Sequence, residues 1–382
     1  MKIAGNCTAA FQGVRQEFEA NFADGELGAS CAVFHRGELV VDLRGGYRDL
    51  AATQAWESDT IANVWSTTKM MAALCVLMLH DRGLLSVDEP VARYWPEFSA
   101  AGKSDVLVRH VLSHTAGLPG FDPPIDADTL FDQPRAAANL AAQAPWWEPG
   151  TASGYHASTQ GFLLGELVRR TSGRSLGTFF AEEIAGPLHA DFHIGLAQSE
   201  FPRVAEICTA GCEATEGDAS PPPDELPRRV HRGEPPHLKL VNTDRWRRAE
   251  LPASNGHGNA RSVARVLSCL AGTGQVDGIR LLSAATIERI FEVQAEGRDL
   301  ILGKLVRFGI GYGLPSQDMP LGVNDRTCFW AGWGGSMAVV DVENNLAIAY
   351  VMNRMRSGTS GDLRAGRLIF AAHAAAKAVR NA

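Results

Sequence analysis

The chain has 382 residues, of which 45% are hydrophobic and 21% charged, so it is long enough for two or three domain-sized units and a large core. A formal net charge of −7, with no basic cluster denser than Arg228-Arg229 or Arg247-Arg248, argues against a nucleic-acid-binding surface. Seven scattered cysteines form no disulfide framework, and no secretory leader or membrane-spanning apolar run is visible, so we expect a cytoplasmic protein without a membrane partner.

The N-terminal part predicts a helix followed by a hairpin. Apolar residues recur at spacings of three and four over residues 8–22, which is typical of an amphipathic helix. Two β-rich runs, 29–35 and 38–44, follow and are separated by Arg36-Gly37, a turn signal. These runs are expected to pair with each other.

The middle of the chain is rich in helical signals. Helical periodicity or capping residues mark the segments 66–82, 87–95, 105–113, 134–143, 157–170 and 175–185. The stretch 213–236 is rich in proline and acidic residues before it becomes basic, so we expect a long surface loop there.

A second hairpin, 336–342 with 346–352, and a helix over 362–379 close the chain. The expected fold class is α/β: an antiparallel β-sheet flanked by helices, built from residues 1–85 and 255–382, plus an inserted, mainly helical domain of residues 86–254. The cleft between these two parts is the expected ligand site.

The segment most informative about chemistry is Ser66-Thr67-Thr68-Lys69, which opens a strongly apolar helix. Residues three apart share a helix face, so the Lys69 amine can reach the Ser66 hydroxyl. The helix dipole and apolar neighbours both favour a neutral lysine, which can accept the serine proton. The alternative is that Ser66 only caps the helix and Lys69 is a solvated first-turn residue.

Together with three further motifs, this segment resembles the serine β-lactamases of class C, the related penicillin-binding proteins and especially the family VIII carboxylesterases. The further motifs are Leu112-Ser113-His114-Thr115-Ala116-Gly117-Leu118-Pro119, Tyr155-His156-Ala157 and Trp333-Gly334-Gly335-Ser336. The resemblance implies a β-lactamase/transpeptidase-like fold, Ser66 as nucleophile, Lys69 and Tyr155 as proton-transfer groups, and backbone N–H groups of Ser66 and Ser336 as the oxyanion hole.

Tyr155 lies in a glycine- and serine-rich turn just before a predicted helix, where a tyrosine could also serve only to anchor the loop. A phenol needs a neighbouring positive charge to act as a base, and Lys69 could provide one. The titrations of the two groups would be coupled, so the sequence leaves open which of them takes the proton.

Two departures from the resembled enzymes bear on the substrate. Ala157 stands where β-lactamases and penicillin-binding proteins of this type usually carry asparagine, and Trp333-Gly334-Gly335 stands in place of Lys-Thr-Gly. Tryptophan cannot hold a substrate carboxylate by charge-assisted hydrogen bonds, but it offers an apolar wall. An uncharged small-molecule ester therefore suits the cleft better than a carboxylate-bearing lactam. The residues expected to contact substrate are Trp333, Gly334, Gly335, Phe121, His156 and Asn255.

Several weaker patterns are set aside. Gly173-Arg174-Ser175-Leu176-Gly177 matches a nucleophile elbow, but a predicted helix precedes it instead of a strand, so Ser175 is expected to be an N-cap. The His110/His114 and His189/His193 pairs and the Cys208/Cys212 pair fit no metal motif, so neither a metal nor another cofactor is expected.

The sequence therefore predicts a serine hydrolase that cleaves short- to medium-chain carboxylic esters through an acyl-enzyme on Ser66. The alternatives are β-lactamase, D,D-peptidase-like or acyl-transferase activity, and a catalytically silent scaffold of the same fold. Homo-oligomerisation is compatible with the sequence but is not specified by it.

Overall fold

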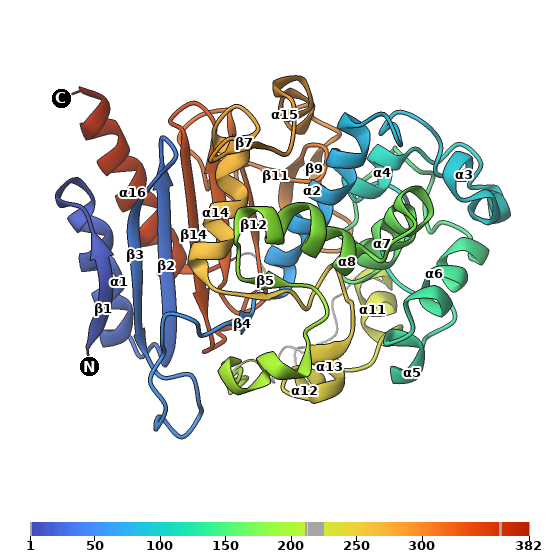
Figure 1. Ribbon diagram of the computed structural model, residues 1–382. Coiled ribbons are helices and arrows are strands. Elements are labelled where there is room, and N and C mark those ends of the chain that lie inside the picture. The colour runs from blue at the N-terminus through green and yellow to red at the C-terminus, as the bar shows by residue number, and fades with distance from the viewer. Residues whose placement is uncertain (1, 211, 213–224, 359–360, 382) are drawn as a thin grey trace.

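A computed structural model describes residues 2–210, 212, 225–358 and 361–381 (Figure 1). Nine strands form one antiparallel sheet in the order β1-β3-β2-β14-β13-β12-β11-β10-β9. The strands are β1 (Ile3–Cys7), β2 (Gly28–His35), β3 (Glu38–Gly46), β9 (Ala295–Arg298), β10 (Leu305–Phe308), β11 (Gly313–Leu314), β12 (Thr327–Ala331), β13 (Met337–Asp341) and β14 (Leu346–Met352). The predicted α/β class with a large antiparallel sheet is confirmed.

The two ends of the chain meet in the middle of this sheet. Strand β2 is buried along its whole length, as its mostly small and apolar residues allow. It pairs with β3 on one side and with β14 on the other, where Cys31 lies opposite Tyr350. Both predicted hairpins are therefore present, and they are joined edge to edge.

Five strands of the sheet were not predicted from the sequence. Strand β9 reads Ala-Glu-Gly-Arg and β11 has only two residues, so neither carries an alternating apolar pattern. Strand β1 contains a glycine and lies at the sheet edge, where its pairing with β3 defines it. Short strands of this kind are fixed by their neighbours, which local sequence does not report.

Helices cover both faces of the sheet (Figure 1). Helices α1 (Gln12–Ala23) and α16 (Leu363–Asn381) pack together on one face, and α14 (Ala260–Ala271) lies on the other, against β2 and β14. The remaining helices are α2 (Thr68–Asp81), α3 (Val91–Tyr94), α4 (Val108–Leu112), α5 (Ala127–Leu130), α6 (Gln133–Ala142), α7 (Thr159–Ser172), α8 (Leu176–Phe180), α9 (Gly186–Leu188), α11 (Glu225–Arg232), α12 (His237–Leu240), α13 (Asp244–Arg248) and α15 (Ala284–Ile290).

Short 3-10 and π turns and two small sheets complete the described structure. The turns are η1 (Ala9–Phe11), η2 (Trp65–Thr67), η3 (Pro96–Gly102), η4 (Ala181–Ala185) and η5 (Gln198–Arg203). One small sheet joins β4 (Ala62–Asn63), β6 (His257–Gly258) and β5 (Phe192–His193), and the other joins β7 (Gln275–Val276) and β8 (Ile279–Arg280).

Three expectations for the middle of the chain need correction. The helices expected over 87–95 and 105–113 are short, because only Val91–Tyr94 and Val108–Leu112 are helical. Proline at the position before α3 and again just after it confines that helix to one turn. In the expected loop 213–236, Glu225–Arg232 forms helix α11, while residues 213–224 lie outside the described part of the chain.

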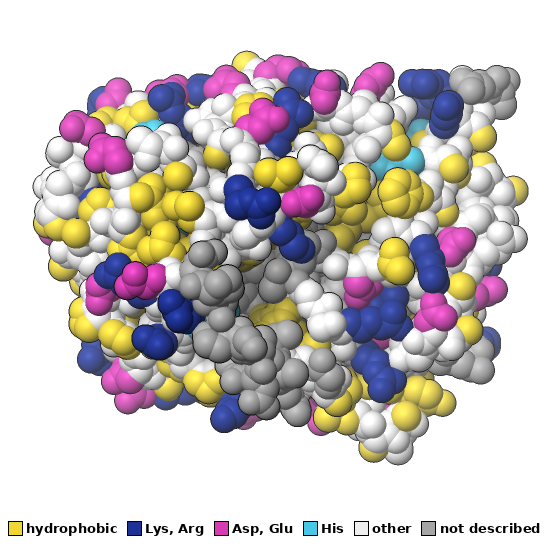
Figure 2. Space-filling model, turned by 180° about the vertical axis from the view of Figure 1, so that it is seen from behind, with side chains coloured by type: hydrophobic (Ala, Val, Ile, Leu, Met, Phe, Trp, Pro, Cys, Tyr) yellow, Lys and Arg dark blue, Asp and Glu magenta, His cyan; other side chains and the backbone are white. Residues whose placement is uncertain are grey.

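Residues 1–85 and 255–382 contribute all nine strands of the large sheet, which supports our proposed division into a discontinuous α/β domain and a helical domain of residues 86–254. Across the described residues, no helix combines the length and apolar character needed to cross a membrane. Figure 2 shows basic and acidic side chains interspersed over one face of the molecule.

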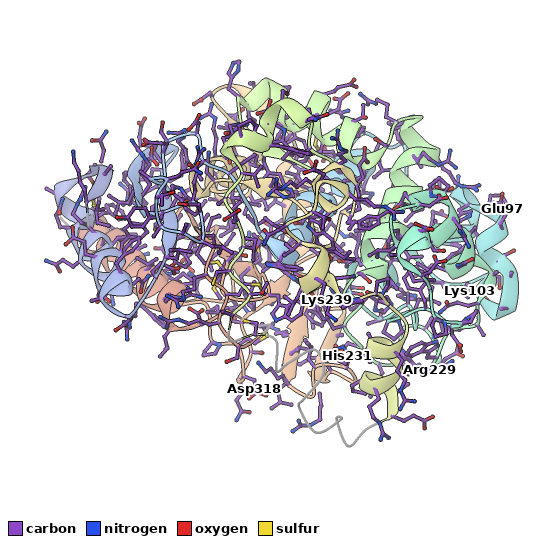
Figure 3. The ribbon with its side chains drawn as sticks, turned by 90° about the horizontal axis from the view of Figure 1, so that it is seen from below. Glu97, Lys103, Arg229, His231, Lys239 and Asp318 are labelled. Carbon is purple, nitrogen blue, oxygen red and sulfur yellow. The ribbon has the colours of Figure 1, made fainter. Side chains whose placement is uncertain are left out.

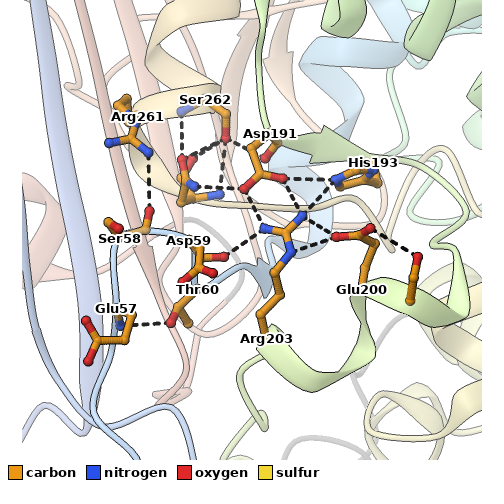
Figure 4. Close-up of polar contacts among 12 residues, drawn as sticks. Glu57, Ser58, Asp59, Thr60, Asp191, His193, Glu200, Arg203, Arg261 and Ser262 are labelled. Carbon is orange, nitrogen blue, oxygen red and sulfur yellow. Dashed lines mark hydrogen bonds and ion pairs between the residues drawn. The ribbon is translucent and has the colours of Figure 1, made fainter.

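A charged network fixes the segment that leads into β4 (Figure 4). Arg203 donates to both carboxylate oxygens of Asp191, to Glu200 and to the backbone oxygen of Asp59 at 2.7 Å. Ser262 at the start of α14 donates to the Asp191 backbone oxygen at 2.7 Å. The network therefore ties the chain just before β4 to the helix that covers the sheet.

Candidate active site

The candidate nucleophile lies in a tight turn at the start of α2. Trp65–Thr67 forms a 3-10 turn, and Trp65 has a φ of +47°, a conformation that costs a bulky residue energy. Helix α2 follows at Thr68, and its residues from Met70 to Leu79 are all buried. The buried helix holds the turn in place, so half-buried Ser66 is presented from a rigid base.

Three side chains from two distant parts of the sequence meet at this turn. The Nζ atom of Lys69 lies 3.2 Å from Ser66 Oγ, and the phenolic oxygen of Tyr155 lies 2.8 Å from the same Oγ. Lys69 Nζ also lies 5.0 Å from the centroid of the Tyr155 ring. The structure thus brings an amine and a phenol within direct hydrogen-bonding reach of one hydroxyl.

Lys69 is buried, with 1% of its surface exposed, and its Nζ is in hydrogen-bonding contact with Ser66 Oγ and two backbone oxygens. Its Nζ donates to the backbone oxygen of Ala157 at 2.6 Å and to that of Ala253 at 2.9 Å. Burial lowers the pKa of Lys69 well below its ordinary value, and the charge of Glu234 opposes that shift. A neutral amine has two donors, which the two carbonyls occupy, so its lone pair is directed to Ser66.

Tyr155 has the opposite electrostatic character. Burial raises the pKa of Tyr155 to about 12, although its hydrogen bond with Ser66 and its contact with Trp330 lower it. The phenol is therefore protonated at neutral pH and can donate to Ser66 Oγ. These directions favour Lys69 over Tyr155 as the group that first accepts the serine proton.

The loop that carries Tyr155 is held from two sides. The backbone oxygen of His114 accepts from Gly154 N at 3.0 Å, and His114 Nδ1 accepts from His156 N at 3.1 Å. Buried Asp299 accepts from Tyr155 N at 3.0 Å. The histidine of the Leu112–Pro119 motif thus fixes the residues on both sides of the phenol.

Ser336 fastens the start of β13 to the nucleophile turn. Its Oγ donates to the backbone oxygen of Val64 at 2.7 Å and lies 3.1 Å from Thr67 Oγ1. A Cβ on Gly332 would lie 2.1 Å from Ser336 Oγ and 2.3 Å from the Val64 oxygen, so only glycine permits this approach. Ser336 is thereby held against the turn that carries Ser66, through Val64 on one side of the turn and Thr67 on the other.

A cavity of about 550 Å³ opens over Ser66. Its lining residues are Trp65, Ser66, Tyr155, Ala157, Val230, His231, Glu234, Pro235, Pro236, His237, Ser254, Lys304, Trp333 and Gly358. Trp65 and Trp333 form an aromatic part of the wall, with their rings 5.2 Å apart. Buried Trp246, which does not line the cavity, packs against Trp65 at 5.6 Å. Another hollow, of about 440 Å³ between the β2–β3 hairpin and α14, contains none of the candidate residues.

Of the six residues expected to contact substrate, Trp333 lines this cavity, whereas Phe121, His156 and Asn255 are corrected to interior positions. Phe121 packs against Phe162 at 5.7 Å. The amide of Asn255 donates to the backbone oxygens of Trp246 and Ala249, so it closes a turn.

His156 is a structural histidine. Its Nε2 accepts from Leu118 N at 3.1 Å, and its Nδ1 donates to the backbone oxygen of Gly154 at 2.6 Å. Burial lowers the pKa of His156 to about 3, so the ring is neutral. It joins the Leu112–Pro119 motif to the Tyr155 loop.

Gly334 and Gly335 lie behind the cavity wall and face the protein interior. Their φ values are +83° and +131°, both in the region that favours glycine. A Cβ on Gly334 would meet Met355 at 2.6 Å, and one on Gly335 would meet the Arg364 guanidinium at 2.4 Å. Backbone geometry and tight packing explain these glycines better than the expected close approach to substrate.

Sequence reasoning missed the wall contributed by residues 230–237. Val230, His231, Glu234 and His237 lie on or between α11 and α12, and Figure 3 labels His231 on this segment. The signal that could have found it is Gly233-Glu234-Pro235-Pro236, in which a lone acid stands in a stiffened backbone. It was overlooked because the whole proline-rich stretch 213–236 was interpreted as one surface loop.

Ser175, which lies in the sequence that matches a nucleophile elbow, is an N-cap, as expected. Ser175 Oγ accepts from Thr178 N at the start of α8 and donates to Glu250 at 2.7 Å. Within the part of the chain that the structure describes, no group of three or more histidine, cysteine or acidic residues is placed to hold a metal ion.

Comparison with known proteins identifies relatives along nearly the whole chain. The family model described as Beta-lactamase matches residues 14–373. The esterase/beta-lactamase LipL of Mycobacterium tuberculosis (strain ATCC 25618 / H37Rv) is 33% identical over 365 residues, which cover 93% of this chain and 84% of that protein.

Solved structures give the same picture. The crystal structure of a family VIII carboxylesterase superposes with a TM-score of 0.90 at 40% identity, covering 98% of this chain and 100% of the other. A penicillin-binding protein homologue from Caulobacter crescentus gives the same TM-score, identity and coverage. The chain therefore shares the complete fold of these proteins.

Proposed function

This chain belongs to the beta-lactamase family, and from that premise we propose that it is a serine carboxylesterase that cleaves short- to medium-chain esters through an acyl-enzyme on Ser66. The observation that carries the proposal is the position of Ser66 Oγ, which lies between a buried amine at 3.2 Å and a phenol at 2.8 Å on the floor of a cavity. The similarity to a family VIII carboxylesterase at 40% identity supports the choice of ester.

In the proposed acylation, Ser66 Oγ bonds to the ester carbonyl carbon while its proton passes to neutral Lys69 Nζ. The carbonyl electron pair moves to the oxygen, which the backbone N–H groups of Ser66 and Ser336 stabilise. When the tetrahedral intermediate collapses, the alkoxide takes the Tyr155 proton and leaves as an alcohol. Lys69 then returns its proton to the phenolate, so both groups regain their starting states.

Deacylation repeats these steps with water as the nucleophile. A water molecule attacks the acyl carbon and its proton passes to Lys69, after which Ser66 Oγ leaves and takes the Tyr155 proton, which Lys69 then restores.

The contacts of Ser336 support the oxyanion assignment. Its Oγ donates a hydrogen bond to the Val64 backbone oxygen and contacts Thr67 Oγ1, so the start of β13 is held against the turn that carries Ser66.

The cavity wall supports a preference for uncharged esters. Trp333 occupies the position where a lysine would hold a substrate carboxylate, and its ring packs against Trp65 at an interplanar angle of 59°. An apolar acyl or alcohol group gains free energy by covering these rings, roughly 25 cal/mol for each Å² of apolar surface removed from water. A carboxylate placed against these two rings would lose hydration and gain no charge-assisted hydrogen bond from them.

The experiment compares matched serine variants with a p-nitrophenyl butyrate assay. We expect Ser66→Ala to abolish hydrolysis and Ser175→Ala to retain it, because Ser175 only caps a helix. A serine-reactive fluorophosphonate should label the peptide that contains Ser66. Retained hydrolysis in folded Ser66→Ala would refute the proposal, and hydrolysis of a chromogenic cephalosporin at a rate exceeding the ester rate would reassign the substrate class.

A further inference from the structure

Glu234 is an acidic side chain enclosed in the wall of the Ser66 cavity. Its side chain is 12% exposed, and the carboxylate accepts a short hydrogen bond from Ser158 Oγ. Its other oxygen lies 3.4 Å from Nε2 of His237. None of the steps described above uses this carboxylate, although burying it costs free energy.

The position of Glu234 connects it to Lys69. Ser158 directly follows Ala157, whose backbone oxygen accepts the 2.6 Å hydrogen bond from Lys69 Nζ. The charge of Glu234 acts on Lys69, and the charge of Lys69 acts in turn on Glu234. The Glu234 carboxylate thus bonds to Ser158, and Lys69 bonds to the neighbouring residue in the chain, Ala157.

Other groups near the amine supply no negative charge. Burial lowers the pKa values of His114, His156 and His237, so these rings are neutral at pH 7. The titratable and charged side chains that line the cavity or act on the carboxylate are Lys69 on α2, Tyr155 before α7, His231 on α11, His237 on α12 and Lys304 between β9 and β10.

We propose that the Glu234 carboxylate is the counter-charge for Lys69: it stabilises the ammonium that forms when Lys69 takes the Ser66 proton. The inference rests on the proposed esterase function. Lys69 is neutral before the proton transfer and positive after it, so attraction to a fixed, enclosed carboxylate is stronger in the transition state than in the ground state. Glu234 keeps its charge throughout and acts as a positioning residue.

Protonation of Glu234 should therefore slow the reaction. Burial raises the pKa of Glu234 to about 7, against the opposing effects of Ser158 and Lys69. Above this pH the carboxylate is charged and the ammonium is stabilised, and below it the stabilisation is lost. The rate of ester hydrolysis is thus expected to fall as the pH drops through about 7.

The test is the pH profile of kcat for p-nitrophenyl butyrate in Glu234→Gln and Glu234→Asp. We expect Glu234→Gln to lower kcat at pH 8 by about 10-fold, the effect of one pKa unit on Lys69, and to remove the acidic limb near pH 7. Glu234→Asp keeps the charge and should retain the limb. Wild-type kcat and an unchanged limb in Glu234→Gln would overturn the inference.

Two further variants keep the test decisive if Glu234→Gln does not fold. Ser158→Ala removes the hydrogen bond that lowers the pKa of Glu234, so the acidic limb should move to higher pH, and a limb that stays fixed argues against Glu234. His231→Gln removes the imidazole that also lines the cavity, and loss of the limb in this variant would reassign it to His231.

The two proposals fail separately. Esterase activity that persists in Ser66→Ala overturns the proposed function, whatever the Glu234 profile shows. An inactive Ser66→Ala protein combined with a wild-type profile in Glu234→Gln leaves the esterase proposal standing and removes only the counter-charge.

Discussion

The guanidinium of Arg364 donates a 2.7 Å hydrogen bond from Nη2 to the backbone oxygen of Gly334, which directly follows Trp333 in the wall of the Ser66 cavity. Arg364 is 1% exposed at the start of α16, and it also pairs with buried Glu26 at 2.5 Å. The C-terminal helix therefore supports the segment that carries Trp333. A long, buried cation is retained here because it satisfies a backbone oxygen and a buried carboxylate together.

Arg364→Met should leave the Glu26 carboxylate buried without its ion-pair partner. We expect the free energy of unfolding to fall by about 3–5 kcal/mol, measured by urea denaturation. Arg367→Met is the matched control, because Arg367 lies on the same helix and makes a half-exposed ion pair with Asp24. That control should cost less than about 1 kcal/mol. Equal losses in the two variants would contradict the structural role of Arg364.

Gly334→Ala should destabilise the protein more than Gly303→Ala. Both glycines have positive φ values, +83° and +64°, so each alanine incurs backbone strain of about 1–3 kcal/mol. A Cβ at Gly334 also meets Met355 at 2.6 Å, whereas nothing lies within 4 Å of one at Gly303. Thermal unfolding followed by circular dichroism measures the difference. A Gly303→Ala midpoint as low as that of Gly334→Ala would be inconsistent with this packing.

Tyr155→Phe removes the proton donor nearest Ser66 Oγ and should reduce kcat by about 10²–10⁴-fold. Tyr312→Phe is the control, because the Tyr312 hydroxyl donates to the Met70 backbone oxygen on the other side of α2's first turn. Loss of that bond should cost about 1 kcal/mol of stability and leave kcat unchanged. Steady-state kinetics with p-nitrophenyl butyrate measure both effects. A kcat of Tyr155→Phe within threefold of the wild-type value would show that the phenol has no role in the mechanism.

Asp341 should make the stability depend on pH in acid. Burial raises the pKa of Asp341, but hydrogen bonds from His373, Asn324 and Asn344 outweigh it and hold the pKa at about 2. A depressed carboxyl pKa stabilises the fold above its unfolded value near 4, and this stability is lost as the pH falls toward 2. The contribution is about 2 kcal/mol at neutral pH. Urea midpoints of Asp341→Asn should therefore fall less between pH 6 and pH 3 than those of the wild type.

Much of the fold could be predicted because its central elements carry strong local patterns. The hairpins over β2–β3 and β13–β14 and the helices α1, α2, α6, α7 and α16 follow from apolar periodicity. The strands β9 to β12 could not be predicted in this way, because they are short and are held by pairing with their neighbours. Helix α11 was not predicted, because the prolines around it favoured a loop.

In the candidate site, too, the features with a local sequence pattern were predicted and those set by tertiary packing were not. The helix spacing of Ser66 and Lys69 and the resemblance carried by the motifs located the nucleophile turn, and the structure brings Tyr155 to it. Side chains that complete the cavity through tertiary packing were not visible in sequence, because nothing local links Glu234 to Lys69 across so many intervening residues. Phe121 and Asn255 were misassigned for the same reason: residue type alone does not distinguish a cavity wall from the interior behind it.

The pairing of β2 with β14 has a consequence for synthesis of the protein. Cys31 lies opposite Tyr350, so the N-terminal hairpin leaves the ribosome long before its partner strand exists. At usual elongation rates the interval is roughly 15–60 s, during which one edge of a strand that is fully buried in the fold has no native neighbour. Such an edge is a template for aggregation, so we expect nascent chains to need chaperone protection until the last strands emerge.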